Sequence, residues 1–448
     1  MKPQSSKGTR DFNAIDVRRR NHIIGILKDA FETFAFNPLE TPSFENIETL
    51  MGKYGEEGDR LIFKILRSGD YMKNVEDSSN PKIREISDKA LRYDLTVPFA
   101  RYVSQNAGKL SFPFKRYQIQ PVWRADRPQK GRFREFLQCD ADVVGSSSLW
   151  QEVEMIDLYS HVFDKLNLSV KINLNNRKIL SGIATVCGVG NRLIEFTVAL
   201  DKLDKIGEVG VISELRDKGF SEKEIDDLKP ALRPLVNFDD SILFLKDWLN
   251  ASDEALEGIK ELEFIVKNIR SPDLLRLNIS LARGLNYYTG CIIEVSAADV
   301  EIGSIGGGGR YDNLTSMFGL DDISGVGISF GLDRILLCLE ELNLLPNGIN
   351  KSVNIVVIRT SEDCSIYTYG WTQELRQNGI SVDYYPEVVK QKKQYEYAEK
   401  IGATYVLLAD EVDMKQDHLR VKNLKTGHQD VVSSKNIVSF FQNIKTIN

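Results

Sequence analysis

The side chains best suited to binding a polar ligand gather between residues 115 and 145. Apolar and polar residues alternate on both sides of a basic loop, which predicts two antiparallel strands with one apolar and one polar face. Phe136 falls on the polar face. An aromatic ring exposed there gains no burial unless a flat ligand stacks on it. Gln138 and Asp142 lie four residues apart on that face, so both can contact one ligand. An ordinary half-solvated hairpin has the same alternation, and these three side chains favour a site over that alternative.

Positive charge is concentrated in the loop of this hairpin. Arg124 ends the outgoing strand, and the loop adds Arg127, Lys130, Arg132 and Arg134. Guanidinium groups form strong, geometrically specific hydrogen bonds with phosphate oxygens. The loop therefore suits a phosphorylated ligand.

Residues 91–97 alternate in the same way and are followed by Pro98, which predicts a strand that ends there. Asp94 and Thr96 would then project from one face of that strand. A carboxylate and a hydroxyl in this arrangement suit an ammonium group, by charge and by hydrogen bonding. A solvent-facing polar edge has the same spacing, so the pattern alone leaves both interpretations open.

A further candidate segment, LARGLNYYTG, spans residues 281–290 and is predicted to end one strand and start another. It places Arg283 shortly before the paired tyrosines Tyr287 and Tyr288. As a bare pattern, this arrangement fits plain structure better than a functional site.

The glycine-rich stretch at residues 304–314, SIGGGGRYDNL, lacks a strand followed by the G-x-G-x-x-G spacing of a dinucleotide-binding turn. We expect its glycines to permit close backbone approach beside a substrate instead. Residues 328–342 then pass from a small-residue strand into a helix, with Arg334 in its first turns.

The surrounding segments divide the chain into parts of different character. Asn13 is a predicted N-cap of an amphipathic helix that Pro38 and Pro42 follow. Residues 180–269 are Leu-rich, charged and helical in period, and they contain no catalytic constellation. Residues 342–352 have the composition of a linker. Beyond them short apolar strands alternate with helices, which predicts a compact α/β domain of about a hundred residues.

Composition excludes several classes of function. The chain has 448 residues, of which 42% are hydrophobic and 27% charged. Its five cysteines include no C-x-x-C pair and its four histidines lie outside the motifs, which argues against zinc sites, disulfides and His-based catalysis. No phosphate-binding loop of the G-x-x-x-x-G-K-[ST] type occurs. No apolar run approaches a membrane span and the start lacks a signal-peptide core, so we expect a cytoplasmic protein without membrane contact.

The motifs, taken in order, resemble those of the class II aminoacyl-tRNA synthetases. Arg124, the basic loop and the return segment RFREF resemble motif 2, and RPQKGRFREF with QCDAD is similar to the histidyl-tRNA synthetase version. LRYDLTVPFAR and LARGLNYYTG are similar to segments of the same family. GLDR with Arg334 resembles motif 3, and the proline-broken helix and strand resemble motif 1. The resemblance spans essentially the whole chain.

The resemblance implies an α+β fold. A class II catalytic domain with an antiparallel sheet would comprise residues 1–180 and 270–346, with a helical insertion domain at 181–269. An α/β anticodon-binding domain would comprise residues 350–448, although its net charge is close to balanced and composition alone does not point to RNA. A homodimer joined through motif 1 is also implied.

The resemblance further implies a ligase that activates L-histidine with ATP and Mg²⁺ to histidyl-adenylate and transfers the histidyl group to the 3′ end of tRNA(His). Arg283 and Arg124 would act catalytically at the carboxylate and the α-phosphate. The L-histidine site would comprise Asp94, Thr96, Arg124, Gln138, Asp142, Arg283, Tyr287 and Tyr288. The ATP site would comprise Arg124, Arg132, Phe136 and Arg334, with no metal held by the protein. Asn286 departs from the family, which usually has Asp there.

Two other functions fit parts of the sequence. A non-catalytic paralogue, such as the regulatory subunit of ATP phosphoribosyltransferase, would share the fold, but proteins of that kind lack the C-terminal domain and usually degrade the LARGL signature. This chain keeps both. A pure RNA-binding protein would have no use for Phe136, Arg124 and Arg334 together.

Overall fold

The computed structural model describes residues 2–73, 75–129, 131–233, 237–284, 287–346, 349 and 355–445. It divides between Leu345 and Pro346 into a large unit and a smaller C-terminal unit, with residues 12–19 grouped with the second. Part of the predicted linker, and the predicted start of the last domain at residue 350, lie outside the described residues. The exact domain boundaries therefore stay predictions.

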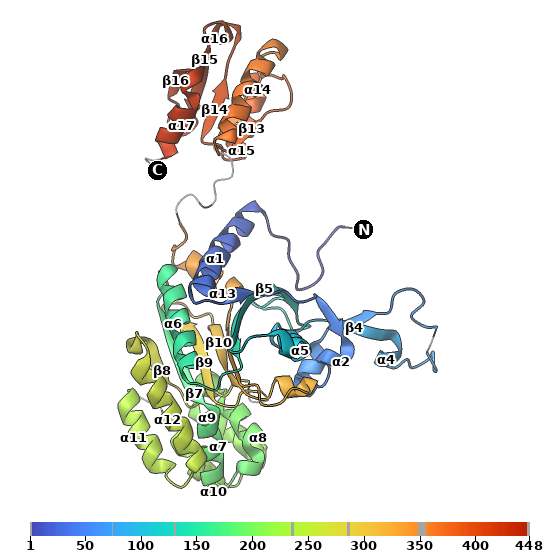
Figure 1. The fold of residues 1–448 in the computed structure, drawn as a ribbon, viewed down its shortest axis with the longest axis vertical. Helices are drawn as coiled ribbons and strands as arrows, with labels where there is room; N and C mark the ends of the chain where they lie inside the picture. The colour runs from blue at the N-terminus through green and yellow to red at the C-terminus, as the bar shows by residue number, and fades with distance from the viewer. Residues whose placement is uncertain are drawn as a thin grey trace. The chain divides into compact units, whose positions relative to one another are not determined.

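An eight-stranded sheet forms the centre of the large unit (Figure 1). All neighbouring strands pair antiparallel except the two pairs at the edges, which are parallel. This confirms the predicted α+β fold built on an antiparallel sheet. In spatial order the strands are β1 (Asn37–Pro38), β5 (Phe114–Trp123), β6 (Glu135–Val144), β11 (Gly325–Phe330), β10 (Ser304–Tyr311), β9 (Cys291–Ala297), β7 (Val170–Asn176) and β8 (Leu275–Leu277).

The β5–β6 hairpin has the apolar face that its alternation predicts. Tyr117, Cys139, Ala141 and Val143 are buried in the main core. Helices α1 (Ala14–Thr33), α6 (Trp150–Lys165) and α13 (Leu332–Glu341) contribute side chains to the same core. Because these helices occupy the apolar face of the hairpin, its polar face is left for the site.

Helix α1 begins as predicted. The Asn13 side-chain oxygen accepts hydrogen bonds from the backbone N–H groups of Ile15 and Asp16, at 2.8 and 3.1 Å. The Asp16 carboxylate accepts in return from the Asn13 N–H at 3.2 Å. These bonds satisfy donors that a helix start otherwise leaves unpaired.

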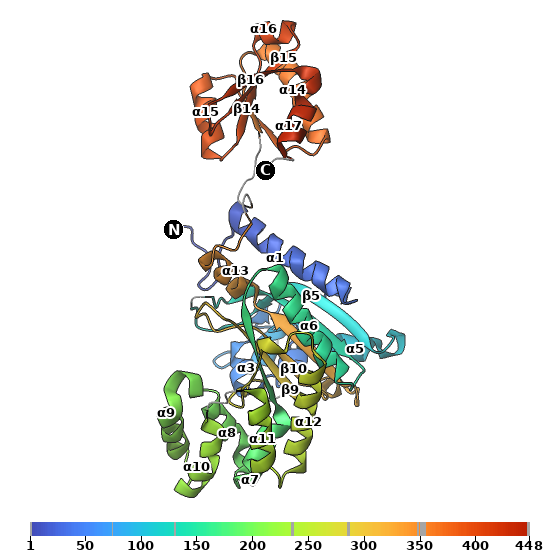
Figure 2. The same cartoon turned by 90° about the vertical axis from the view of Figure 1, so that its left-hand side faces the viewer.

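The segment between β7 and β8 is helical in the part that the structure describes, and its helices gather beside the sheet (Figure 2). They occupy the predicted span and start slightly earlier. Their status as a separate insertion domain stays a prediction. They are α7 (Arg177–Val186), α8 (Leu193–Leu200), α9 (Leu203–Asp217), α10 (Glu222–Leu228), α11 (Phe238–Trp248) and α12 (Asp253–Asn268).

A smaller sheet precedes the hairpin and corrects one prediction. The strand expected at 91–97 ends at Leu91, and helix α5 (Thr96–Asn106) begins five residues later. Pro98 lies in the first turn of that helix, where a missing N–H costs nothing. Elements of this region are β2 (Phe44–Asn46), α2 (Ile47–Leu50), α3 (Gly55–Leu61), β3 (Lys64–Leu66), α4 (Ile83–Ile86) and β4 (Ser87–Leu91), with sheet order β2-β4-β3.

The C-terminal unit is the predicted α/β domain. Its sheet has the order β13-β12-β14-β15-β16, parallel among the first three strands and antiparallel among the last three. Two helices end shortly before Gly379 and Gly402, whose φ angles of +70° and +73° suit glycine. The elements are β12 (Ile355–Val357), α14 (Glu362–Gln377), β13 (Val382–Tyr384), α15 (Gln391–Lys400), β14 (Tyr405–Leu408), α16 (Glu411–Lys415), β15 (His418–Asn423), β16 (Gln429–Ser433) and α17 (Ile437–Lys445).

Among the helices that the structure describes, none is both long and apolar enough to cross a membrane.

Candidate active site

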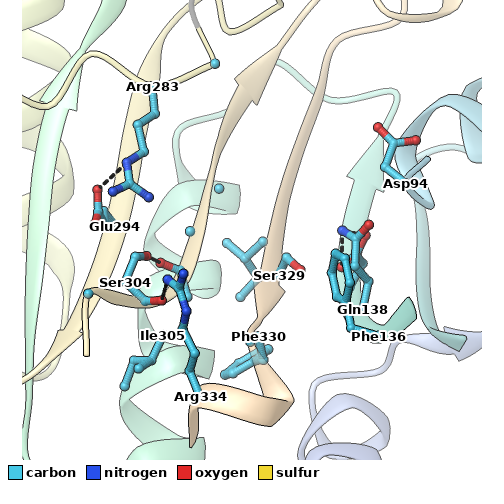
Figure 3. A pocket seen from close by; sticks show the side chains of 18 of the residues that line it. Asp94, Phe136, Gln138, Arg283, Glu294, Ser304, Ile305, Ser329, Phe330 and Arg334 are labelled. Carbon is cyan, nitrogen blue, oxygen red and sulfur yellow. Dashed lines mark hydrogen bonds and ion pairs between the residues drawn. The ribbon is translucent and has the colours of Figure 1, made fainter. Parts of the chain in front are cut away.

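A cavity of about 1030 Å³ lies over the polar face of the large sheet. Figure 3 shows Arg283 and Arg334 on one side of this cavity and Asp94, Phe136 and Gln138 on the other. The structure brings together every side chain that the sequence selected for the site, from segments up to 240 residues apart. The lining includes Asp94, Thr96, Arg124, Arg132, Phe136, Gln138, Asp142, Arg283, Tyr287, Tyr288 and Arg334.

One end of the cavity is acidic and buried. Arg116 on β5 and Asp142 on β6 are partners in the hairpin register, and Nη2 of the arginine lies 2.8 Å from Oδ2 of the aspartate. Tyr311 donates its hydroxyl hydrogen to the other oxygen of Asp142 at 2.5 Å. Burial raises the pKa of Asp142, and the charge of Arg116 opposes that shift. The Asp142 carboxylate is therefore fixed in place by two side chains.

Asp140 lies beside Asp142 on the same face and was not selected from the sequence. Burial raises its pKa to about 7, against the effect of Arg116, and the charge of Asp142 adds to the rise. The Gln138 amide nitrogen lies 3.3 and 3.4 Å from the two Asp140 oxygens. Its amide oxygen accepts from Nη2 of Arg124 at 3.3 Å. Asp140 and Arg124 thus fix which way the Gln138 amide points.

Asp94 reaches the cavity from a turn, not from the strand that its alternation predicts. It lies just before helix α5, and its carboxylate accepts from the Val97 N–H at 3.1 Å. The Tyr54 hydroxyl donates to the same oxygen at 2.9 Å. Burial raises the pKa of Asp94. Thr96, the first residue of α5, also lines the cavity, so the two side chains share the site despite the wrong strand prediction.

Arg124 lies between the acidic end of the cavity and two aromatic rings, those of Tyr93 and Phe136. Its Nε donates to the Tyr93 carbonyl oxygen at 3.0 Å. Its guanidinium carbon lies 4.4 Å from the centroid of the Tyr93 ring and 5.2 Å from that of Phe136. These distances are within the range of cation–π attraction, so the guanidinium is held before any ligand binds.

The other end of the cavity is cationic. Burial lowers the pKa of Arg334, and the positive charges of Arg283 and Arg132 lower it further. Arg334 donates from Nη1 to the Ser304 carbonyl oxygen at 2.7 Å. Arg283 and Arg132 thus add positive charge around Arg334, and Glu294 partly offsets it. This end suits an anion with several charges.

Arg283 and Arg132, the two more exposed arginines at this end of the cavity, each have an acidic partner. Nε of Arg283 lies 2.9 Å from Oε2 of Glu294, and Nη2 of Arg132 lies 2.9 Å from Oδ2 of Asp126. About half of each arginine side chain is exposed, at 51% and 49%. These side chains are positioned yet still accessible to a ligand.

The glycines of β10 and β11 allow close packing beneath the cavity. A Cβ on Gly308 would lie 2.2 Å from the carbonyl oxygen of Gly327, and one on Gly327 would lie 2.0 Å from Oδ1 of Asp142. The predicted close approach therefore involves neighbouring strands and a site carboxylate. Gly306, Gly307 and Gly308 also line the cavity.

Sequence reasoning missed Arg116, Asp140, Glu294 and Tyr311. Asp140 had a signal, because it alternates with Cys139 and Ala141 on the same polar face as Gln138 and Asp142. Arg116 also had a signal, because it lies on the outgoing strand of the predicted hairpin and pairs with Asp142 in its register. Glu294 and Tyr311 lie on other strands and reach the site only through the sheet order. Two residues named from the sequence, Lys130 and Asn286, lie outside the described residues.

Comparisons with known proteins agree with one another. The family described as histidyl-tRNA synthetase matches residues 8–335, and the family described as anticodon binding domain matches residues 353–444. A histidine–tRNA ligase of Christiangramia forsetii is 54% identical over 441 residues, which cover 96% of this chain and 97% of the relative. One of Flavobacterium johnsoniae is 52% identical over 458 residues, covering 96% of each chain.

Solved structures extend these matches. The crystal structure of histidyl-tRNA synthetase from Nostoc sp. PCC 7120 has a TM-score of 0.81 at 28% identity and covers 99% of both chains. A Bacillus halodurans structure titled ATP phosphoribosyltransferase regulatory subunit/histidyl-tRNA synthetase has a TM-score of 0.74 at 17% identity and covers 92% of this chain and 99% of its own. At that identity the second match supports the fold alone.

Proposed function

The chain belongs to the histidyl-tRNA synthetase family, and from that premise we propose how its cavity joins L-histidine to tRNA(His) at the expense of ATP. The activity is that of a ligase, because relatives matching 96% of the chain are histidine–tRNA ligases. A regulatory paralogue is not favoured, since the chain aligns with catalytic relatives through both the synthetase and the anticodon-binding families. The observation that carries the proposal is the polarity of the cavity, acidic at one end and cationic at the other.

We place L-histidine at the acidic end. Its α-ammonium group would be held by Asp94, Thr96 and Gln138, which line one side of the cavity. Asp142 would accept a hydrogen bond from an imidazole N–H, and the Tyr288 hydroxyl would serve the other ring nitrogen. Tyr287 would close the pocket against the ring. A buried pocket that hydrogen-bonds both nitrogens rejects analogues that leave its own polar groups unpaired.

We place the polyphosphate of ATP at the cationic end, between Arg132 and Arg334, and its adenine on Phe136 across the cavity. ATP enters as its magnesium complex, so Mg²⁺ belongs to the substrate and is coordinated mainly by phosphate oxygens and water. In the described residues no group of three or more His, Cys, Asp and Glu side chains is arranged to hold a metal.

Arg124 and Arg283 would flank the reacting atoms. A carboxylate oxygen of histidine attacks the α-phosphorus, the bond to the bridging oxygen breaks, and pyrophosphate leaves. No proton has to be removed, because the carboxylate is already ionised. Catalysis then rests on alignment and on stabilising the charge that builds up on the phosphate, which two preplaced guanidinium groups can supply. The terminal ribose hydroxyl of tRNA next attacks the acyl carbon, the bond from that carbon to the phosphate oxygen breaks, and AMP leaves, while the hydroxyl proton passes to a phosphate oxygen or to water.

The C-terminal unit would bind the anticodon arm, and two chains would form a homodimer through α1 and the strand that follows Pro38. We also infer a cytoplasmic location, where tRNA is charged for protein synthesis. Support for these three statements comes from the family. Sedimentation equilibrium of the purified chain tests the dimer, and a monomer at micromolar concentration would contradict it.

The main test is histidine-dependent exchange of pyrophosphate into ATP. We expect exchange with L-histidine, none above background with the other amino acids, and charging of tRNA(His) transcripts. A chain that binds tRNA but shows no exchange would be an RNA-binding or regulatory protein instead.

A further inference from the structure

The start of the chain packs on the loop that carries Arg132. We call Lys7–Arg10 the N-terminal strap and residues 125–134 the basic loop. The Arg134 N–H donates to the Gly8 carbonyl oxygen at 2.9 Å, and its guanidinium donates to the Lys7 carbonyl oxygen at 3.4 Å. The strap therefore follows the edge of the basic loop through backbone contacts.

Gly8 is suited to this contact in two ways. Its φ angle is +85°, which favours glycine. A Cβ there would lie 2.8 Å from Cγ and Cδ of Arg134 and 3.0 Å from Cγ of Pro128. Any other residue at this position is strained and forces either the strap or the Arg134 side chain to shift.

Arg10 connects the basic loop to helix α13. Its guanidinium carbon lies 3.6 Å from the centroid of the Phe133 ring. Its Nη2 donates to Oδ1 of Asp333 at 2.5 Å, and Arg20 donates to the same oxygen at 2.9 Å. Phe133 and Asp333 both line the cavity. One side chain from the strap thus touches both segments that carry the proposed ATP contacts.

The basic loop also packs directly against α13. A Cβ on Gly131, whose φ is +71°, would lie 3.2 Å from Cγ of Arg334. The loop residues and Arg334 are therefore close enough that the position of one constrains the other. Within the loop, the backbones of Gln129 and Arg132 exchange hydrogen bonds of 3.1 and 2.9 Å. Phe133, the next residue, is the one that Arg10 covers.

We propose that Arg10 is a positioning residue for ATP, which holds the basic loop against the first turn of α13 in the arrangement that accepts the polyphosphate. This proposal rests on the proposed function, because it takes the cationic end of the cavity as the ATP site. A loop that is ordered before binding spares the ligand the cost of ordering it. When only a fraction of molecules has the competent loop, the apparent dissociation constant rises by the inverse of that fraction.

Replacing Arg10 should affect ATP and spare histidine. We expect Arg10→Ala to raise KM for ATP about 5- to 10-fold, the scale of one charge-assisted hydrogen bond together with one cation–π contact. KM for histidine should change less than about twofold, because the histidine contacts lie at the other end of the cavity. Arg10→Lys should give an intermediate value, since an ammonium keeps the ion pair with Asp333 but lacks the flat surface that covers Phe133.

A double-mutant cycle separates positioning from general destabilisation. Arg10→Ala and Asp333→Asn should be strongly non-additive in KM for ATP, because both disrupt the charged Arg10–Asp333 contact. Asp333→Asn also weakens the contact with Arg20, which adds a part that the cycle does not share. Lys7→Ala is the matched control. It removes a positive charge from the strap but keeps the carbonyl oxygen that Arg134 uses. Additive effects in the cycle, or an equal effect of Lys7→Ala, would overturn the proposal.

Limited trypsin digestion provides a readout without catalysis. The basic loop contains several arginines, so its release should speed cleavage within residues 125–134 several-fold in Arg10→Ala and Gly8→Ala, and not in Lys7→Ala. Added Mg·ATP should slow the cleavage. Unchanged cleavage in both strap variants would overturn the proposal. Failure of the proposed function would instead appear as absent exchange in the unmodified chain, whatever the digestion pattern.

Discussion

Arg116 and Asp142 face each other across the β5–β6 hairpin, 2.8 Å apart between Nη2 and Oδ2, with 0% and 3% of their side chains exposed. A buried ion pair of this kind seldom adds much stability, because both groups lose their hydration. Its value here is geometric. Together with the Tyr311 hydroxyl it fixes the carboxylate that we assign to the imidazole before the substrate arrives.

Neutralising Asp142 tests that assignment. We expect Asp142→Asn to raise KM for histidine by about 10²-fold, since a charge-assisted hydrogen bond becomes a neutral one and the amide can present its donor side to the ring. KM for ATP should change less than about twofold. Both constants are measured in the exchange assay, beside Asp164→Asn on the exposed face of α6. If KM for ATP rises as much as KM for histidine, Asp142 does not hydrogen-bond the imidazole.

Arg283 provides a test of charge stabilisation. Its guanidinium pairs with Glu294 and is half exposed, so Arg283→His is not expected to disturb the core. Loss of one preplaced cation at the reacting phosphate should lower kcat for adenylation by roughly 10²–10³ and leave histidine binding nearly unchanged. Single-turnover formation of the adenylate gives this rate directly, with the exposed Arg270→Ala as control. An unchanged single-turnover rate would contradict the catalytic role.

Asp140 predicts a dependence of stability on pH. Its pKa is raised to about 7 in the folded chain from 3.8, mainly by burial, so between these values the folded state binds more protons than the unfolded state. The unfolding free energy must then fall as pH rises through this window. Asp140→Asn removes this titrating group. The free energy of unfolding of the variant, relative to that of the unmodified chain, should therefore increase by on the order of 2 kcal/mol between pH 5 and pH 8.

Urea unfolding at several pH values measures this difference. Asp142 titrates together with Asp140, and Arg116 and Asp94 face the same pair, so the slope belongs to the cluster. Asp142→Asn should therefore flatten the pH dependence as well. The difference in unfolding free energy between Asp140→Asn and the unmodified chain should widen toward pH 8. If it does not, Asp140 is ionised throughout this pH range.

Local patterns in the sequence predicted the hairpin, the strand-to-helix passage at Arg334 and the C-terminal α/β unit. These features follow from alternation, capping and glycine placement, which neighbouring residues determine. The strand at 91–97 was wrong because alternation over seven residues also fits a turn followed by a helix. In the structure the Asp94 carboxylate accepts a hydrogen bond from the Val97 N–H. Pro98 lies in the first turn of α5, where a backbone N–H would have no hydrogen-bond partner within the helix.

Two of the missed site residues, Glu294 and Tyr311, depend on contacts that no local pattern contains. Tyr311 reaches Asp142 from 169 positions away, because β11, the strand between them, is so rich in glycine that the ring can cross it. Asp333 meets Arg10 from 323 positions away. Such pairs become visible only when the three-dimensional arrangement of the elements is known. The family resemblance identified the site residues that match family motifs. The structure added the side chains that hold them in place, such as Arg116 and Tyr311 on Asp142.

The division of labour between the two units gives the last prediction. Every side chain that we assign to L-histidine or ATP precedes Leu345, and the C-terminal unit has its own core, including Ile355, Leu375 and Leu407. A chain ending at Pro346 should therefore keep part of its histidine-dependent exchange while charging of tRNA(His) falls by at least about 10²-fold, because anticodon contacts and their contribution to binding are lost. Circular dichroism and a cooperative thermal transition must first show that the fragment is folded. The informative quantity is the ratio of the two activities in the same preparation. Equal loss of exchange and charging in a folded fragment would mean that the C-terminal unit also supports adenylation, and our assignment of the units would be wrong.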